Sequence, residues 1–389
     1  MTLSDPIIIS GGGIAGLAAA ISLAQRGLPS IVLEQARQFE EVGAGLQLGP
    51  NGMRAIEALG VKEALMPKLV APQAVSIRDG VTGRVLTEVP LGRNIVERFG
   101  QPYHVVHRAD LLAALVETAQ GLPLIRLETN RQVTGFSEDG RGIRVNLDTG
   151  RSETAPALIG ADGIRSAVRK GVVGDDPIAF ANCTLYRGLV ARRKAPAAAQ
   201  VDDVTLWLCP GGHVVHYPVS GGDKVNIVAA FDNHWHEPGW GSHGSKRALV
   251  TAFGKVAPAL AEVLDATDRW LKWAAADREP VTTWGKGRVT LIGDAAHPVL
   301  PFLAQGAAMA LEDAVVLGRK IEVNRDFALA FRQYEAERQP RTAMMRQQTR
   351  RVGKAYHAKG VVRAARNVIL GLMTPERSYR QMQWIYGWH

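Results

Sequence analysis

The 389-residue sequence has few cysteines and no long apolar run. Its two cysteines, Cys183 and Cys209, are too few for a disulfide framework in a chain of this length, so we expect a cytoplasmic protein. No apolar run approaches the roughly 18 residues that span a bilayer, and the sequence starts with neither the basic region nor the cleavage site of a signal peptide. A composition of 46% hydrophobic and 21% charged residues is that of a globular protein.

The net charge of +9 comes from one C-terminal stretch. Such a stretch can meet nucleic acid or anionic lipid, but no aromatic interleaving or nucleic-acid motif accompanies it. We therefore expect a solvated helical face that raises the local potential for anionic ligands, and no nucleic-acid partner. Nine basic residues and no acid make up the stretch: Arg338, Arg341, Arg346, Arg350, Arg351, Lys354, Lys359, Arg363 and Arg366.

The N-terminal part of the chain predicts a strand, a helix and a second strand. We expect strands over residues 6–10 and 30–34 and a helix over residues 14–26 that ends at Gly27. The loop Gly11-Gly12-Gly13-Ile14-Ala15-Gly16 joins the first strand to the helix, which is the context that the dinucleotide fingerprint requires. This βαβ unit predicts a nucleotide-binding fold.

Each glycine of this loop has a physical reason. Gly11 permits the tight turn, Gly13 lets the backbone approach a pyrophosphate, and Gly16 lets the helix pack closely on the strand. The helix N-terminus supplies free N–H donors to the phosphates. Glu34 ends the second strand, where an acid hydrogen-bonds an adenosine ribose. Together these features predict an adenine dinucleotide.

Two later segments indicate which dinucleotide. Asp294 follows an apolar strand over residues 289–292, and an Asp at a strand end can accept hydrogen bonds from a polyol such as ribityl. The small residues 305–310 open a helix, where backbone N–H groups can reach the edge of a planar, electron-rich ring. A third segment, Gly160-Ala161-Asp162-Gly163, also follows a short strand. Each segment alone is also compatible with an ordinary turn.

Three motifs together, in their order along the chain, resemble the single-component FAD-dependent aromatic hydroxylases, over a stretch from Ile7 to about Arg341. They are the glycine loop 11–16, the segment 160–166, and the segment 293–298 with the helix start at 305–310. The resemblance implies a monooxygenase that uses NAD(P)H and O₂ and hydroxylates a small phenolic acid through a flavin C4a-hydroperoxide. The segment 42–47 resembles the flavin-side loop of that family. The resemblance also implies that FAD is bound by Gly11, Gly13, Ile14, Ala15, Gly16, Glu34, Gln47, Arg108, Asp162, Asp294, Gly306, Ala307, Ala308 and Met309.

The fold class expected is α/β (α+β), with a Rossmann-like FAD-binding domain, an inserted antiparallel-sheet substrate domain and C-terminal helices. Alternating runs punctuated by Gly-Gly pairs between residues 183 and 231 predict the antiparallel sheet. Helices are expected from Arg108 and over 247–264, 306–320 and 327–356. We assign residues 1–72, 97–177 and 280–340 to the FAD domain, 73–96 and 178–279 to the substrate domain, and 341–389 to a basic helical region.

One strand of the sheet domain carries the candidate catalytic residues. In the segment 211–218, strand alternation puts His213, Val215 and Tyr217 on one face and His216 on the other. The segment resembles the substrate strand of hydroxybenzoate and salicylate hydroxylases, which implies His213 as general base and Tyr217 as a substrate-positioning group. The expected substrate contacts are Tyr186, Arg187, Val215 and Pro301.

The substrate stays open between relatives. The chain ends resemble 3-hydroxybenzoate 6-hydroxylases, which carry a glutamine where this chain has Pro301. The spacing around Pro301 is more like salicylate 1-hydroxylases and 6-hydroxynicotinate 3-monooxygenases. We favour the hydroxybenzoate class, with an N-heteroaromatic hydroxylase, or an FAD-binding or membrane-surface protein without hydroxylase activity, as alternatives. We also expect NADH as reductant, a possible homodimer and no metal site, although His234 and His236 have ligand-like spacing.

Overall fold

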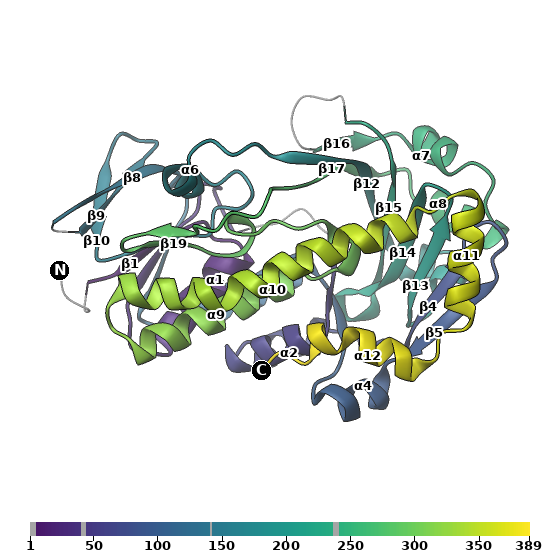
Figure 1. Ribbon diagram of the computed structural model, residues 1–389, viewed down its shortest axis with the longest axis horizontal. Helices are drawn as coiled ribbons and strands as arrows, with labels where there is room; N and C mark the ends of the chain where they lie inside the picture. The colour runs from purple at the N-terminus through teal and green to yellow at the C-terminus, as the bar shows by residue number, and fades with distance from the viewer. Residues whose placement is uncertain (1–4, 40–43, 141, 236–240) are drawn as a thin grey trace.

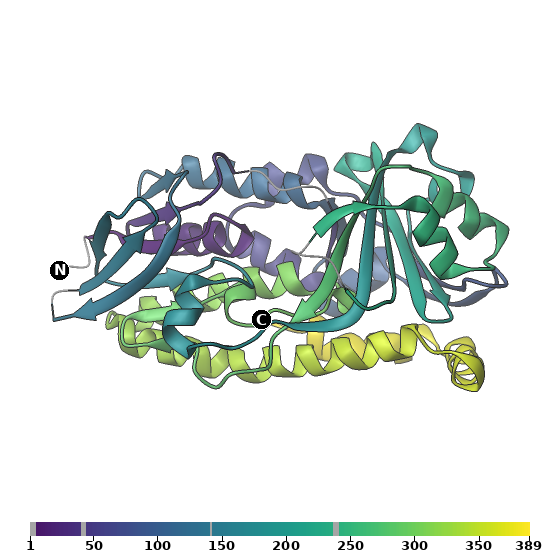
Figure 2. The ribbon, with the colours of Figure 1, turned by 90° about the horizontal axis from the view of Figure 1, so that it is seen from above.

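The computed structural model describes residues 5–39, 44–140, 142–235 and 241–389. Val42, Gly43 and His236, named above in the flavin-side loop and the histidine pair, lie outside these ranges. The molecule is elongated, with one sheet system toward each end (Figures 1 and 2). None of the helices in the described ranges combines the length and apolar character that a membrane span requires.

A six-stranded sheet forms the half that carries the glycine loop and confirms the predicted βαβ unit. Its strand order is β18-β19-β11-β1-β2-β7, and every neighbouring pair is parallel except β18 with β19. Helix α1 (Ile14–Ala24) links β1 to β2. The central strands β1 and β2 are buried along their whole length, as is typical of a parallel sheet that is covered on both faces. The strands are β1 (Ile7–Ser10), β2 (Ser30–Leu33), β7 (Ile125–Glu128), β11 (Leu158–Gly160), β18 (Gly285–Lys286) and β19 (Val289–Leu291).

An eight-stranded sheet forms the other half, in the order β16-β17-β12-β15-β14-β13-β4-β5. All neighbours are antiparallel except β13 with β4. Strands from two separated stretches of the chain share it, which supports the proposed insertion of a substrate domain. The strands are β4 (Ala74–Asp79), β5 (Val85–Pro90), β12 (Ala179–Ala191), β13 (Val204–Cys209), β14 (Gly212–Val219), β15 (Lys224–Asp232), β16 (Gly241–Gly244) and β17 (Trp270–Asp277).

Two small sheets complete the β-structure. Strands β8 (Val133–Asp139), β9 (Gly142–Leu147) and β10 (Ser152–Ala155) form an antiparallel sheet, and β3 (Gly45–Leu48) pairs with β6 (His104–His107). Gly45 of β3 packs against the eight-stranded sheet: its N–H donates to Asn226 Oδ1 at 2.8 Å. Strand β3 is therefore a direct contact between the two halves.

Helix α10 (Phe327–Tyr356) runs along the length of the molecule, from the six-stranded to the eight-stranded sheet (Figures 1 and 2). It begins where Asp326 accepts hydrogen bonds from the N–H groups of Ala328 and Leu329, and it ends at His357. It packs beside α9 (Gly306–Val323). The other helices of the described ranges that matter below are α2 (Pro50–Ala58), α5 (Arg108–Gln120), α6 (Ala167–Val173), α11 (Gly360–Gly371) and α12 (Pro375–Tyr386).

One sequence expectation is wrong, and a second holds only in part. The helix expected over 247–264 is two helices, α7 (Lys246–Phe253) and α8 (Pro258–Asp265). The first ends at Gly254, whose φ of +59° favours glycine, and the second starts at Pro258, which has no N–H to leave unpaired.

The basic C-terminal stretch is a solvated face only in part. Arg351, Lys354 and Lys359 are exposed, but acids from distant parts of the chain pair with several of its other residues. Arg346 and Arg350 contact the buried Asp277, and Arg363 contacts the buried Asp79. The pairs with Asp277 come from α10 and the pair with Asp79 comes from α11, so these charges link both helices to the eight-stranded sheet.

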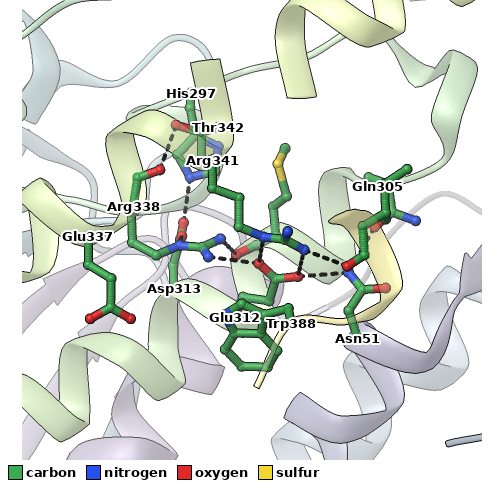
Figure 3. A network of polar contacts seen from close by, with 12 residues as sticks. Asn51, His297, Gln305, Glu312, Asp313, Glu337, Arg338, Arg341, Thr342 and Trp388 are labelled. Carbon is green, nitrogen blue, oxygen red and sulfur yellow. Dashed lines mark hydrogen bonds and ion pairs between the residues drawn. The ribbon is translucent and has the colours of Figure 1, made fainter. Parts of the chain in front are cut away.

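A buried ionic network forms the junction of α2, α9 and α10 (Figure 3). Arg338, 1% exposed, places Nη1 at 2.7 Å from Glu312 Oε2 and Nε at 2.6 Å from Asp313 Oδ1, and both carboxylates are fully buried. Asp313 Oδ2 also accepts the Gly293 N–H at 3.0 Å and lies 2.5 Å from His297 Nε2. Burial opposes ionisation, but the charges of His297 and Arg338 hold the pKa of Asp313 below its usual value.

Replacing Arg338 with Met tests this network. The change leaves two buried carboxylates without their shared cation, so we expect a loss of about 3–5 kcal/mol in the free energy of unfolding. Arg319→Met is the matched control, because Arg319 pairs with Glu337 at the surface and its loss costs at most about 1 kcal/mol. Urea unfolding followed by circular dichroism measures both. Equal stability of the two variants would contradict a dominant role for Arg338.

Candidate active site

A cavity of about 730 Å³ extends from the carboxyl ends of β1 and β2 to one face of the eight-stranded sheet. Binding sites in doubly wound folds form at such strand ends. Most of the residues proposed from the sequence line this cavity: Gly11, Gly13, Ile14, Ala15, Glu34, Gln47, Arg108, Asp162, Asp294, Gly306, Ala307, Arg187, His213, Val215, Tyr217 and Pro301.

The glycine loop gives the cavity a backbone-lined end. Gly11 has a φ of +104°, and a Cβ there would lie 2.5 Å from the Ala161 carbonyl oxygen. A Cβ at Gly16 would lie 1.9 Å from the Gly11 oxygen, so Gly16 serves close packing and does not line the cavity. At Gly13, by contrast, a Cβ would meet nothing within 4 Å among the described residues. The loop thus turns open backbone toward the cavity where α1 begins, as a pyrophosphate requires.

Glu34 lies at the same end. Its Oε2 accepts the Gly12 N–H at 2.7 Å, and its Oε1 accepts the Ala36 N–H at 2.8 Å. These two bonds orient the carboxylate, and its remaining lone pairs are available to a hydroxyl donor in the cavity. This arrangement fits an adenosine ribose.

The middle of the cavity is formed by the turn after β19 and the start of α9. Asp294 is exposed although its neighbours are buried, because it faces the cavity. Gly306 and Ala307 also line the cavity, and a Cβ at Gly306 would meet nothing within 4 Å in the described structure. A carboxylate beside open helix N–H groups suits a polyol and a flavin ring, so the residues fit FAD.

The next two residues of α9 do not line the cavity. Ala308 packs near Gly52, and Met309 is fully buried among apolar side chains. The Met309 N–H already donates to the Gln305 carbonyl at 2.9 Å. A contact of Met309 with flavin therefore stays a prediction that this geometry does not support.

Asp162, Arg108 and Gln47 reach the cavity from three other elements. Asp162 caps α6: its Oδ2 accepts the Ala167 N–H at 2.8 Å, and burial raises its pKa. Arg108 is the first residue of α5, and its N–H donates to the Ala44 carbonyl at 2.8 Å. Gln47 Oε1 accepts the Tyr103 hydroxyl at 2.5 Å. Asp162 thus lines the cavity while a backbone N–H group of α6 fixes the position of its carboxylate.

The far wall of the cavity is the face of β14 that alternation predicts. His213, Val215 and Tyr217 line the cavity, whereas His216 lies on the opposite face and accepts the Trp207 Nε1–H at 3.0 Å. Burial, and then the His357 ring, lower the pKa of His213 to about 3. Burial raises the pKa of Tyr217 above its usual range, although the Arg187 charge opposes this. The wall therefore presents a neutral imidazole and a protonated phenol.

The neighbours Tyr186 and Arg187 point to opposite faces of β12. Arg187 lines the cavity and lies 4.9 Å above the Trp273 ring. Tyr186 packs against Phe231 and Trp270 in the core behind the sheet, so the expectation that it lines the substrate cavity is corrected. Adjacent strand residues cannot share a face.

Pro301 lines the cavity in the turn before α9, close to Ala304. Ala304 has a φ of +52°, a left-handed conformation that costs a non-glycine residue roughly 1–2 kcal/mol. This strained turn leads directly into the helix start that lines the cavity.

Sequence reasoning missed two buried partners of this wall. Asn226 holds Gly45 and so positions β3 against Tyr217. His357 Nε2 lies 2.9 Å from His213 Nδ1, although 144 positions separate the two residues. No local pattern marks either residue.

Replacing Gly13 with Val tests the open face of the loop. The side chain fits the protein but projects into the cavity, so we expect a folded variant that binds FAD at least about tenfold more weakly, or ~1.4 kcal/mol. Titration of the apoprotein with FAD, followed by flavin fluorescence, measures this. Gly121→Val, at the end of α5 with only ordinary contacts, is the control and should bind FAD normally. Normal binding by the Gly13 variant would contradict the assignment.

Comparison with known proteins agrees with this geometry. A family model described as an FAD binding domain matches residues 5–349. A 3-hydroxybenzoate 6-hydroxylase of Polaromonas naphthalenivorans is 40% identical over 99% of this chain and 96% of that protein. A 6-hydroxynicotinate 3-monooxygenase of Bordetella bronchiseptica is 32% identical over 87% of this chain and 88% of that protein.

A solved structure extends the similarity to the fold. Klebsiella pneumoniae HpxO complexed with FAD and uric acid superposes with a TM-score of 0.87 at 28% identity, over 98% of this chain and 97% of that chain. The chain therefore belongs to the FAD-binding-domain family of flavoprotein aromatic monooxygenases.

Proposed function

We propose that this protein hydroxylates a small phenolic aromatic acid, with 3-hydroxybenzoate as the first candidate. The observation that carries the proposal is the far wall of the cavity, where His213, Tyr217 and Arg187 converge at the end opposite the glycine loop. A base, a hydrogen-bond donor and a cation match a phenol and a carboxylate on one ring. The 40% identity to a 3-hydroxybenzoate 6-hydroxylase supports the same substrate class.

The cofactor, the apolar wall residues and His213 have separate roles in the proposed reaction. FAD, when bound, supplies the activation of O₂ with electrons from NADH. Leu185, Val215 and Val228 give the wall apolar surface that excludes water from the ring. His213 is neutral near pH 7, because burial lowers its pKa to about 3, and it accepts the phenolic proton.

Tyr217 and Arg187 orient the substrate. Burial raises the pKa of Tyr217, so its hydroxyl stays protonated and can donate a hydrogen bond. The guanidinium of Arg187 can pair with the substrate carboxylate while it remains over the Trp273 ring. The phenol is then turned toward His213.

A second candidate is an N-heteroaromatic acid such as 6-hydroxynicotinate. Pro301 favours it, because the sequence around this residue resembles that of 6-hydroxynicotinate 3-monooxygenases rather than the glutamine-bearing hydroxylases. An FAD-binding or membrane-surface protein without hydroxylase activity is disfavoured, because the relatives compared are monooxygenases.

Three further attributes complete the proposal. NADH is the proposed reductant, as in degradative relatives of this family. A homodimer is proposed because dimers are common in the same family. A cytoplasmic location is supported by Cys183 and Cys209, which are both free and buried.

A substrate screen tests the proposed function. We expect the FAD-loaded protein to oxidise NADH slowly alone and at least about tenfold faster with the correct acid, since substrate binding prepares the site for reaction. With 3-hydroxybenzoate the expected product is a dihydroxybenzoate, identified by chromatography. Products from 6-hydroxynicotinate alone would favour the second candidate. Peroxide accounting for all NADH consumed with every acid would contradict the hydroxylase proposal.

Arg187→Met tests recognition of the carboxylate. Loss of a charge-assisted pair costs about 1.5–3 kcal/mol, so KM for the acid should rise about 10- to 100-fold, with a smaller change in kcat. The neutral analogue 3-hydroxybenzamide should bind the variant and the wild type alike. Arg93→Met, at a side chain that is 88% exposed, is the control. An unchanged KM for the acid would rule out pairing with Arg187.

A further inference from the structure

Three titratable side chains form a continuous line from the cavity to the surface. His213 Nδ1 lies 2.9 Å from His357 Nε2, and His357 Nδ1 lies 2.6 Å from Asp232 Oδ1. The exposed fraction increases along the line, from 5% for the His213 residue and 8% for the His357 side chain to 46% for the Asp232 side chain. The inner end is in the cavity wall, and the outer end meets solvent.

The fold brings these residues together from three elements. His213 belongs to β14, Asp232 ends the adjacent β15, and His357 follows the last residue of α10. Gly211 fixes the junction, because its N–H donates to the His357 carbonyl at 3.1 Å and its carbonyl accepts the Asp232 N–H at 2.8 Å. A Cβ at Gly211 would lie 2.5 Å from Lys359 Cε, so a side chain there would push this junction apart.

The hydrogen bonds define one set of proton positions. An ionised carboxylate only accepts, so Asp232 requires the proton of His357 on Nδ1. The lone pair of His357 Nε2 then accepts the Nδ1–H of His213. This leaves the lone pair of His213 on Nε2, in a ring that lines the cavity. The inner end of the line is thereby set to accept a proton.

We propose that His213, His357 and Asp232 form a proton relay that carries the phenolic proton of the substrate from the cavity to the surface. The relay rests on the proposed function. The phenol O–H bond breaks as the His213 Nε2–H bond forms, and the His213 Nδ1 proton passes to His357 Nε2. The His357 Nδ1 proton then passes to Asp232 and to water. Of these three residues only His213 touches the substrate, and His357 and Asp232 are positioning and transfer residues.

Electrostatics explain why one histidine is not enough. Burial and the neighbouring ring lower the pKa of His213 to about 3, so a proton cannot rest there near pH 7. Burial also lowers the pKa of His357, but the Asp232 carboxylate opposes that shift, so positive charge is better tolerated one step outward. Transfer of the His213 Nδ1 proton to His357 therefore lets His213 accept the phenolic proton although the buried ring disfavours a positive charge.

The other charged and titratable neighbours are compatible with this path. Lys359 Nζ lies 3.2 Å from Asp232 Oδ2, and Lys359 and Arg366 both disfavour charge on His357. Tyr356 packs on the His213 ring, and burial raises its pKa to about 12. Burial also raises the pKa of the Cys183 thiol near Asp232 to about 12. Neither of the last two groups exchanges protons near pH 7.

His357→Gln separates proton transfer from packing. The amide can still accept from His213 and donate to Asp232, but it cannot pass a proton onward. We expect KM and FAD content to stay within about twofold, and kcat for hydroxylation to fall about 10- to 100-fold near neutral pH. The loss should shrink as pH rises toward the phenol pKa of about 10, because substrate already ionised needs no base. Asp232→Asn should lower kcat as well. His213→Ala should retain FAD and show the largest fall in kcat for hydroxylation.

His216→Gln is the matched control. His216 is buried on the same strand, but it faces away from the cavity and bonds Trp207. Its variant should keep the wild-type pH profile. Three results would overturn the relay: an unchanged kcat in His357→Gln, a loss that does not recover at high pH, or an equal loss with the same profile in His216→Gln.

A spectroscopic measurement tests the relay without turnover. Long-range ¹H–¹⁵N correlation of the FAD-loaded protein, with resonances assigned from the single variants, reports which ring nitrogens carry protons. We expect protons on Nδ1 of both His213 and His357 near neutral pH. A proton on Nε2 of His213 in the free protein would overturn the relay. If no aromatic acid is hydroxylated but these tautomers are found, the proposed function fails while the proton path stands.

Discussion

The buried pairing of Arg338 with Glu312 and Asp313 is the interaction on which the site depends. Asp313 holds the turn before Asp294, and Arg338 Nη2 donates to the Met309 carbonyl at 3.3 Å near the start of α9. Glu312 accepts the Asn51 side chain at 2.7 Å, which ties α2 to the same point. The parts of the cavity that suit a ribityl chain and a flavin ring are therefore set by one ionic cluster, far from solvent, where its geometry is strongly enforced.

The two ends of the cavity are built on different principles. At the nucleotide end, the absence of a side chain allows the tight turn at Gly11 and gives access to the backbone at Gly13, so binding there depends on glycine. At the substrate end, function depends on side chains whose protonation the interior controls, chiefly His213 and Tyr217. FAD can be bound identically across such a family while the second wall changes with the substrate.

The sequence predicted what local spacing determines. The glycine loop, Glu34 and the shared face of His213 and Tyr217 follow from neighbours within one strand or turn, and the structure places them at the cavity. Tyr186 was misplaced because it was assigned to the substrate together with its neighbour Arg187, whereas strand alternation allows only one of the two to face the cavity. Packing places Arg187 there and Tyr186 in the core behind the sheet. The acids that neutralise the basic stretch and the contact of His357 with His213 depend on long-range packing, and no residue near them in the chain indicates either.

Helix α10 links these two regions with one rigid element. It carries Arg338 in the ionic cluster, and His357 directly follows its last turn. Nineteen residues of helix span about 28 Å, and each residue turns the helix by about 100°. Inserting or deleting a single residue between these two positions would swing His357 away from His213 even if every contact residue were retained. The number of residues between Arg338 and His357 is thus as important for function as the identity of these two residues.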